Sequence, residues 1–268
     1  MTNKTISVIG LGKLGLPLAA CLASKGLTVV GADVDPDKVR AVNDGVAPLY
    51  EPGLQELLQV TRQRLTATQS VALAVEATDI TFIVVPTPSE ADSGFSLKYV
   101  LAAAETIGRA LRPKQWFHLV VLTSTVMPGS TDGEVRSTLE QASGKVCGEG
   151  FGLCYSPEFI ALGSVIRDFL NPDFLLIGES DPRSGEMLSE VYAQVCDNSP
   201  PVARMSFVNA ELAKLSINAF VTTKITFANM LARICEKLPG AQVDVVTSAL
   251  GLDARIGPKY LKGAIGYG

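Results

Sequence analysis

Three glycines near the N-terminus have the spacing of a phosphate-binding turn. Gly10, Gly12 and Gly15 follow a short apolar run that begins at Ile6. In such a turn the first glycine permits a tight strand-to-helix connection, the second lets backbone N–H groups approach a pyrophosphate, and the third lets the helix pack close to the strand. The helix start also carries partial positive charge, which favours phosphate. The predicted cofactor-binding residues of this turn are Gly10, Leu11, Gly12, Lys13, Leu14 and Gly15.

An acidic residue follows the second apolar run, where a dinucleotide site needs a partner for a ribose. The run 28–32 ends at Asp33. Its carboxylate can accept hydrogen bonds from the adenosine ribose hydroxyls, and its charge would repel a 2′-phosphate. We therefore expect NAD rather than NADP as the cofactor, with Lys38 beside Asp33 in the same site.

Apolar runs alternate with helical stretches over the first 200 residues. Alternation of this kind predicts an α/β fold with a Rossmann-like, doubly wound parallel sheet. Helices are expected at 16–22 and 97–111. The further strands are expected at 28–32, 80–85, 117–122, 151–155 and 174–177.

Polar residues follow three of these expected strands. Pro86 and Thr87 come after the first, Ser124 and Thr125 after the second, and Glu158 after the third. The carboxyl ends of parallel strands form the edge at which open α/β sheets bind ligands. Proline and hydroxyl residues also end strands and cap helices, so each single run has an ordinary structural explanation.

A long helical period follows from Ser206 to about Glu236. Apolar positions recur at spacings of three and four, Ser206 can cap the start, and Pro239 with Gly240 stops the helix. About 30 residues at 1.5 Å each make roughly 45 Å, which is longer than one small domain needs. The segment 221–223, Val-Thr-Thr, weakens helix propensity and could break it.

The two parts suggest a domain organisation. We expect an NAD-binding domain at 1–203 and a helical middle domain at 204–268, with a second helix at 243–250. The long helix could join two domains or two subunits. Its apolar face includes Phe220, Phe227 and Leu231, and because this face exceeds what a small domain can cover, we expect a homodimer.

Lys214 and Asn218 are candidate catalytic residues on this helix. They lie four residues apart and so share a face. An ammonium group can stabilise a developing oxyanion, and the amide can hold the same oxygen or a water. Glu158 is a candidate general acid or base. A solvated lysine and a helix-starting glutamate are the ordinary alternatives, and His118, inside an apolar run, is expected to be a core residue without a catalytic role.

Composition excludes several classes of protein. The formal net charge is −4 without a basic run, which argues against nucleic acid or an anionic membrane as a partner. We expect a cytoplasmic protein, because the N-terminus enters a strand directly and no apolar run approaches a membrane span. The five scattered cysteines lack C-x-x-C spacing, so we expect no metal site and no disulfide.

Together the motifs resemble those of the UDP-glucose/GDP-mannose dehydrogenases. The matching segments are 10–15, 50–54 (Tyr-Glu-Pro-Gly-Leu), 85–88, 124–129, 156–159, 211–218 and 253–257. The resemblance implies oxidation of the C6 alcohol of a nucleotide sugar to the acid, with two NAD per turnover, through a thiohemiacetal and a thioester on a cysteine.

The resemblance also implies roles for individual residues. Lys214 and Asn218 would hold the C6 oxygen, while Thr125 and Glu158 would position water and protons. The remaining assignments are Asp33, Lys38, Pro86, Thr87, Ser124 and Thr125 at the NAD site, and Glu158, Phe159, Lys214, Asn218, Arg255 and Tyr260 at the nucleotide sugar.

One expected feature does not occur in the 268 residues. The family's nucleophilic cysteine follows a glycine-rich segment like 263–268 within a few residues, and none of the five cysteines holds that position. We therefore expect this polypeptide to bind NAD without completing the oxidation. Two alternatives stay open: a single-step hydroxyacid dehydrogenase of the 6-phosphogluconate type, and a non-catalytic NAD-binding and dimerisation module. Reading the gene a few dozen codons past Gly268 would separate them.

Overall fold

The computed structural model describes residues 4–90, 94–161 and 163–264. It contains two compact units that divide between Leu212 and Ala213. This division falls inside the long helix, whereas the domain boundary expected from the sequence lies at 203/204, and that boundary stays a prediction. The glycine-rich end beyond Ala264 lies outside the described residues.

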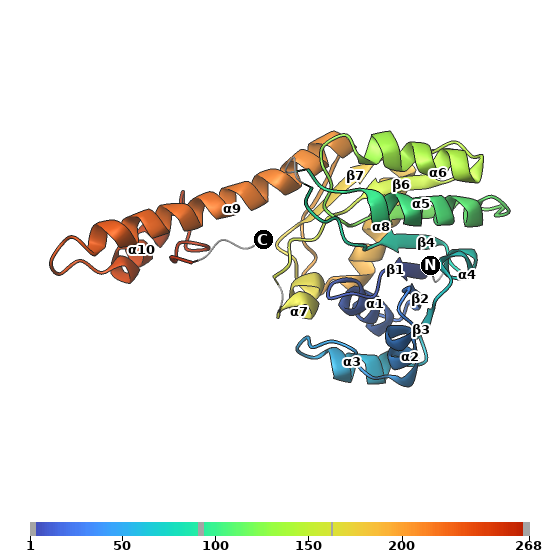
Figure 1. Cartoon of the computed structure of the whole chain (residues 1–268), viewed down its shortest axis with the longest axis horizontal. Coiled ribbons are helices and arrows are strands. Elements are labelled where there is room, and N and C mark those ends of the chain that lie inside the picture. The colour runs from blue at the N-terminus through green and yellow to red at the C-terminus, as the bar shows by residue number, and fades with distance from the viewer. Residues whose placement is uncertain (1–3, 91–93, 162, 265–268) are drawn as a thin grey trace. The chain divides into compact units, whose positions relative to one another are not determined.

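The first unit is built on one sheet of eight strands (Figure 1). The strand order is β3-β2-β1-β4-β5-β6-β7-β8. Neighbouring strands are parallel except for β6 and β7, which are antiparallel. The strands are β1 (Thr5–Ile9), β2 (Thr28–Ala32), β3 (Leu65–Thr68), β4 (Ile80–Ile83), β5 (Leu119–Leu122), β6 (Gly152–Tyr155), β7 (Leu175–Glu179) and β8 (Val202–Met205).

Helices connect the strands and cover the sheet. The largest core cluster joins Ile6 and Val8 of β1 to the almost wholly buried helix α1. Helices α5 and α6 pack side by side (Figure 1). The helical segments of this unit are α1 (Gly15–Ser24), α2 (Pro36–Asp44), α3 (Leu54–Thr61), α4 (Val71–Glu76), α5 (Lys98–Leu111), η1 (Thr131–Val135, a π-helical turn), α6 (Arg136–Ser143), α7 (Val165–Leu170) and α8 (Pro182–Val195).

The expected doubly wound sheet is confirmed, with one reversal at β6–β7. Every strand expected from an apolar run is present. The structure adds β3 and β8, which occupy the two edges of the sheet. Because an edge strand buries less of its surface, neither carries a continuous apolar run: β8 alternates exposed and half-buried residues.

A buried chain of polar side chains runs from the start of β5 through β4 to β1. Lys114 donates to Nδ1 of His118 at 3.0 Å, and Nε2 of His118 lies 2.8 Å from the hydroxyl of Thr81. The hydroxyl of Thr81 in turn lies 2.7 Å from that of Ser7. Because an ammonium group only donates, Nδ1 must accept, and His118 is a neutral imidazole that donates through Nε2. The expectation that His118 belongs to the core agrees with its 1% exposure.

The position of His118 predicts a loss of stability in mild acid. Burial, followed by the nearby Lys114 charge, lowers the pKa of His118 from 6.5 to about 3. Between these values the unfolded chain takes up a proton that the folded chain refuses, so stability falls as the pH drops below 6.5. From pH 7 to pH 5 this single group should remove about 2 kcal/mol from the free energy of unfolding.

Urea unfolding at pH 7 and pH 5 measures this effect. The sequence contains one histidine, so the variant His118→Asn removes the whole histidine contribution. It should be less stable at pH 7 because the polar chain is cut, yet it should lose about 2 kcal/mol less than the unmodified protein on going to pH 5. Equal losses in the two proteins would contradict the neutral, buried assignment.

The second unit contains most of α9 (Phe207–Cys235) and α10 (Val243–Gly251). Helix α9 runs unbroken through 221–223, the segment whose weak helix propensity could have broken it. The hydroxyls of Thr222, Thr223 and Thr226 each donate to the carbonyl four residues earlier, so they are bonded without disturbing the helix.

Within this unit, side chains of α9 also hold the chain that follows α10. Lys224 donates to the carbonyl of Ile256 at 2.9 Å, and the amide of Asn229 both donates to and accepts from the backbone of Ala264.

None of the helices in the described ranges combines the length and the apolar composition that a membrane-spanning helix needs.

Candidate functional site

A cavity of about 710 Å³ opens at the carboxyl ends of the central strands. Its walls come from the turns and loops after β1, β2, β4, β5 and β6 and from helix α5. Twelve of the residues expected at the cofactor or catalytic site line this one cavity: Gly10, Gly12, Lys13, Leu14, Gly15, Asp33, Lys38, Pro86, Thr87, Ser124, Thr125 and Glu158.

The glycine turn has the steric properties that a phosphate site requires. A Cβ atom on Gly15 would lie 1.9 Å from the carbonyl oxygen of Gly10, so helix α1 can approach the turn only with glycine there. A Cβ atom on Gly12 would meet no atom within 4 Å. Packing within the chain therefore does not require glycine at position 12. The absence of a side chain leaves the backbone accessible to a pyrophosphate.

Asp33 is fixed by the backbone around it. Its carboxylate accepts the N–H of Leu11 at 2.8 Å and the N–H of Asp35 at 3.0 Å, and the ammonium of Lys38 lies 3.5 Å away. Leu11, which was expected to bind the cofactor, does not line the cavity, and its side chain is fully buried. A carboxylate has about four acceptor positions, so Asp33 retains capacity for ribose hydroxyls.

The loop after β5 is bonded to the loop after β4. The hydroxyl of Ser124 accepts the N–H of Val85 at 3.1 Å and donates to the carbonyl of Val85 at 2.6 Å. Thr123, which also lines the cavity, is 3% exposed, and its hydroxyl has no hydrogen-bond partner among the described residues. A buried hydroxyl of this kind at a cavity wall is suited to bond a ligand.

Several lining residues were missed by the sequence analysis. Helix α5 contributes Tyr99, Ala102, Ala103 and Thr106. Their spacing of three and four marks one face of a helix, which is the only signal the sequence offers. That face is indistinguishable in pattern from a face that packs on the core, so nothing in the sequence assigns it to a ligand.

The other predicted site residues lie elsewhere. Phe159, beside Glu158, stacks on Phe174 with ring centroids 4.8 Å apart. In the second unit, Lys214 is 7% exposed and Asn218, one helical turn later on α9, is exposed. This unit also contains Arg255, which is paired with Asp253, and Tyr260, which is 47% exposed.

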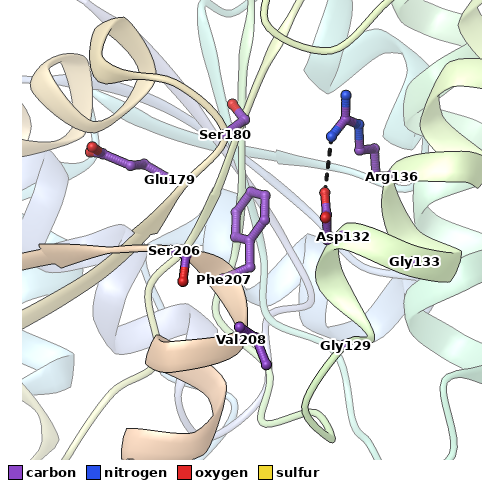
Figure 2. A pocket seen from close by; sticks show the side chains of 9 residues that line it. All are labelled: Gly129, Asp132, Gly133, Arg136, Glu179, Ser180, Ser206, Phe207 and Val208. Carbon is purple, nitrogen blue, oxygen red and sulfur yellow. Dashed lines mark hydrogen bonds and ion pairs between the residues drawn. The ribbon is translucent and has the colours of Figure 1, made fainter.

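A second cavity, of about 510 Å³, is lined by residues from β7, η1 and the start of α9 (Figure 2). Its charged groups are already paired: Arg136 with Asp132 at 2.9 Å, and Glu179 with Arg204 at 2.7 Å. None of the expected catalytic or cofactor residues lines it. We therefore place the candidate functional site in the larger cavity.

Comparison with known proteins gives consistent matches along the chain. Residues 4–196 match the model of the UDP-glucose/GDP-mannose dehydrogenase family, NAD binding domain, and residues 208–268 match the central domain of the same family. The UDP-glucose 6-dehydrogenase AglM of Haloferax volcanii is 40% identical over 266 residues, which are 98% of this chain and 61% of that protein.

Solved structures of similar proteins have the same fold. A UDP-glucose dehydrogenase from Pyrobaculum islandicum superposes with a TM-score of 0.92 at 40% identity, covering 99% of this chain and 60% of that one. A GDP-mannose dehydrogenase from Pseudomonas aeruginosa, solved as a ternary complex, gives a TM-score of 0.88 at 37% identity over 92% and 56% of the two chains. The chain thus spans about three fifths of the length of these proteins.

Proposed function

Because the chain belongs to the UDP-glucose/GDP-mannose dehydrogenase family, we propose that it takes part in the NAD-dependent oxidation of the C6 alcohol of a nucleotide sugar to the uronic acid. Residues 4–196 match the family's NAD-binding domain, so NAD is the cofactor. The observation that carries the proposal is that Glu158, a carboxylate suited to proton transfer, lines the same cavity as the glycine turn and Asp33.

NAD supplies the hydride acceptor in this proposal. The chain's own residues bind it: the glycine turn holds the pyrophosphate, Asp33 and Lys38 hold the adenosine ribose, and Ser124 and Thr125 line the cavity around the rest of the cofactor. Pro86 and Thr87 complete the wall of that cavity.

The alcohol chemistry is assigned to four side chains. Lys214 and Asn218 hold the C6 oxygen, and the low exposure of Lys214 would strengthen its attraction for a developing oxyanion. Glu158 and Thr125 handle protons and water. Phe159, Arg255 and Tyr260 are assigned to binding the nucleotide sugar.

The substrate is proposed as a class: UDP-glucose, UDP-N-acetylmannosamine or GDP-mannose. The test uses the product of the complete open reading frame, incubated with NAD and each sugar in turn. Two NADH and one uronic acid per sugar with one of the three would support the proposal. One NADH with a hydroxyacid instead would support the 6-phosphogluconate-type alternative, and NAD binding without any NADH formation would support a non-catalytic module.

We also propose that the chain forms a homodimer through α9. Phe220, Phe227, Met230 and Ile234 recur at helical spacing and are 65%, 44%, 47% and 45% exposed. We call these four residues the α9 stripe. Exposed apolar residues that recur on one face of a helix are typical of a subunit interface.

Light scattering of the purified chain should give the mass of a dimer at micromolar concentration. Glutamate at Phe220 and Phe227 together should give the mass of a monomer, because burying two charges in an apolar interface is unfavourable. The control Val245→Glu changes an apolar residue of α10 that is 64% exposed and should leave the dimer intact. A monomeric mass for the unmodified chain at high micromolar concentration would refute the proposal.

A further inference from the structure

Two buried glutamates each bind a pair of backbone N–H groups from a distant part of the chain. Glu211 is 0% exposed and Glu51 is 7% exposed. Glu51 belongs to the motif 50–54 and Glu211 to the motif 211–218, and the sequence analysis assigned no role to either glutamate. Neither lines the cofactor cavity.

The contacts of Glu211 are to the segment after β5. One carboxylate oxygen accepts the N–H of Gly129 at 2.6 Å, and the other accepts the N–H of Thr131 at 2.8 Å. Thr131 begins η1, and the loop between β5 and Gly129 contains Ser124 and Thr125, which line the cofactor cavity.

The contacts of Glu51 repeat this arrangement after β6. One oxygen accepts the N–H of Gly163 at 3.1 Å, and the other accepts the N–H of Val165 at 2.8 Å. Val165 begins α7, and the segment after β6 contains Glu158. In each case the first donor is a glycine with a φ of 91°, and the second donor lies two residues later.

Paired N–H groups around such a turn form an anion-binding concavity. Here a carboxylate of the chain itself fills each concavity. A side chain with two acceptor oxygens satisfies both donors at once, whereas water would leave the loop free to move. Each glutamate therefore joins the far end of one strand-end loop to a part of the chain at least 80 residues away in sequence.

We infer that Glu211 and Glu51 are positioning residues, which fix the loops that present Thr125 and Glu158 to the cofactor cavity. Glu211 acts on the β5 loop and so on NAD affinity. Glu51 acts on the β6 segment and so on proton transfer by Glu158. The inference about Glu51 rests on the proposed function, and that about Glu211 needs only NAD binding.

The variants Glu211→Gln and Glu51→Gln test the inference. Glutamine keeps the shape, but its NH₂ group would face a backbone N–H that needs an acceptor. Glu134→Gln and Glu56→Gln are the matched controls, because both glutamates are exposed. Glu134 lies in η1, which begins at Thr131, and Glu56 lies five residues after Glu51. Hydrogen exchange followed by mass spectrometry gives the first readout.

Each variant should loosen only its own segment. In Glu211→Gln, exchange should rise at least tenfold in the peptide containing Gly129 and Thr131, and in Glu51→Gln in the peptide containing Gly163 and Val165. The controls should change neither peptide. A uniform rise over the whole chain, or no rise in either peptide, would overturn the inference.

Calorimetry gives the second readout, because a merely structural role would change stability without changing affinity selectively. Glu211→Gln should weaken NAD binding about tenfold, and Glu51→Gln by less than threefold, since the β5 loop supplies Thr123, Ser124 and Thr125 and the β6 segment only Glu158. Should Glu211→Gln fail to fold, Glu211→Asp keeps both acceptor oxygens on a shorter side chain and should show a smaller loss. Unchanged NAD affinity in a folded Glu211 variant would contradict the inference.

The product of the complete open reading frame gives the third readout. Glu51→Gln should lower kcat about tenfold, alter the pH profile of kcat and change the KM for NAD by less than threefold. If the unmodified protein oxidises no nucleotide sugar, the proposed function fails. The exchange and calorimetry results then still decide whether Glu211 and Glu51 fix the two loops. An unchanged kcat in an active enzyme would overturn the role of Glu51.

Discussion

Replacing Asp33 with alanine is expected to weaken NAD binding by about 10- to 100-fold. A hydrogen bond to a charged acceptor contributes about 1.5–3 kcal/mol, and each 1.4 kcal/mol is a factor of ten in affinity. The substitution also leaves the N–H groups of Leu11 and Asp35 without the carboxylate that they now share. Both effects act on the adenosine end of the site and both reduce affinity.

Calorimetric titration with NAD and with NADP measures the result. The unmodified chain should prefer NAD, because the carboxylate of Asp33 would repel a 2′-phosphate. In Asp33→Ala the preference should shrink, since Lys38 remains as a cation at that position. Asp37→Ala is the control, because Asp37 is an exposed carboxylate of the neighbouring helix that does not line the cavity. Equal affinities for NAD and NADP in the unmodified chain would overturn the assignment of Asp33.

The second large effect is all-or-none: the 268-residue polypeptide should bind NAD without forming a uronic acid. Oxidation from alcohol to acid needs the intermediate aldehyde held covalently, and a thiolate does this. Burial raises the pKa of Cys21 to about 12 and that of Cys196 to about 11. Burial also raises the pKa of Cys147 and Cys154 above the usual range, so these four thiols stay protonated at neutral pH.

Cys235, the fifth, is half-buried at the last residue of α9, and it does not follow the glycine-rich segment 263–268 after which the nucleophile was expected. Incubation with NAD and each of the three nucleotide sugars should therefore give no stoichiometry of two NADH per sugar. The variant Cys235→Ser should behave like the unmodified chain. A uronic acid formed by this polypeptide would show that one of the five cysteines can act as the nucleophile after all.

The sheet was predictable because buried parallel strands leave continuous apolar runs in the sequence. The run 28–32 is recovered residue for residue as β2. The reversal at β6–β7 was not predictable, because antiparallel and parallel pairing both accept an apolar strand such as Leu175–Glu179. The same reasoning explains the uninterrupted α9, since propensity alone does not register the hydroxyl-to-carbonyl bonds of its threonines.

The site was predictable where sequence spacing has a local steric meaning. Gly12 and Gly15 belong to the same short turn, so the conformation of that turn alone decides which atoms lie near each of them. The hydrogen bonds of Glu51 and Glu211 were not predictable, because their partners lie 80 to 114 residues away. These partners are backbone N–H groups, which every residue type except proline supplies. Such contacts become visible only when the fold brings the two segments together.

Thr223 lies on the same side of α9 as the α9 stripe, at helical spacing from Phe220 and Phe227. Its hydroxyl already donates to the carbonyl of Ala219 at 2.9 Å. If a partner surface displaced water from this hydroxyl, its donor would therefore stay bonded, and only the acceptor capacity of the oxygen would lose its contact with solvent. An apolar surface that covers the α9 stripe therefore meets, beside it, a threonine whose donor is already bonded, and the cost of desolvating Thr223 is lower than that of a hydroxyl bonded only to water.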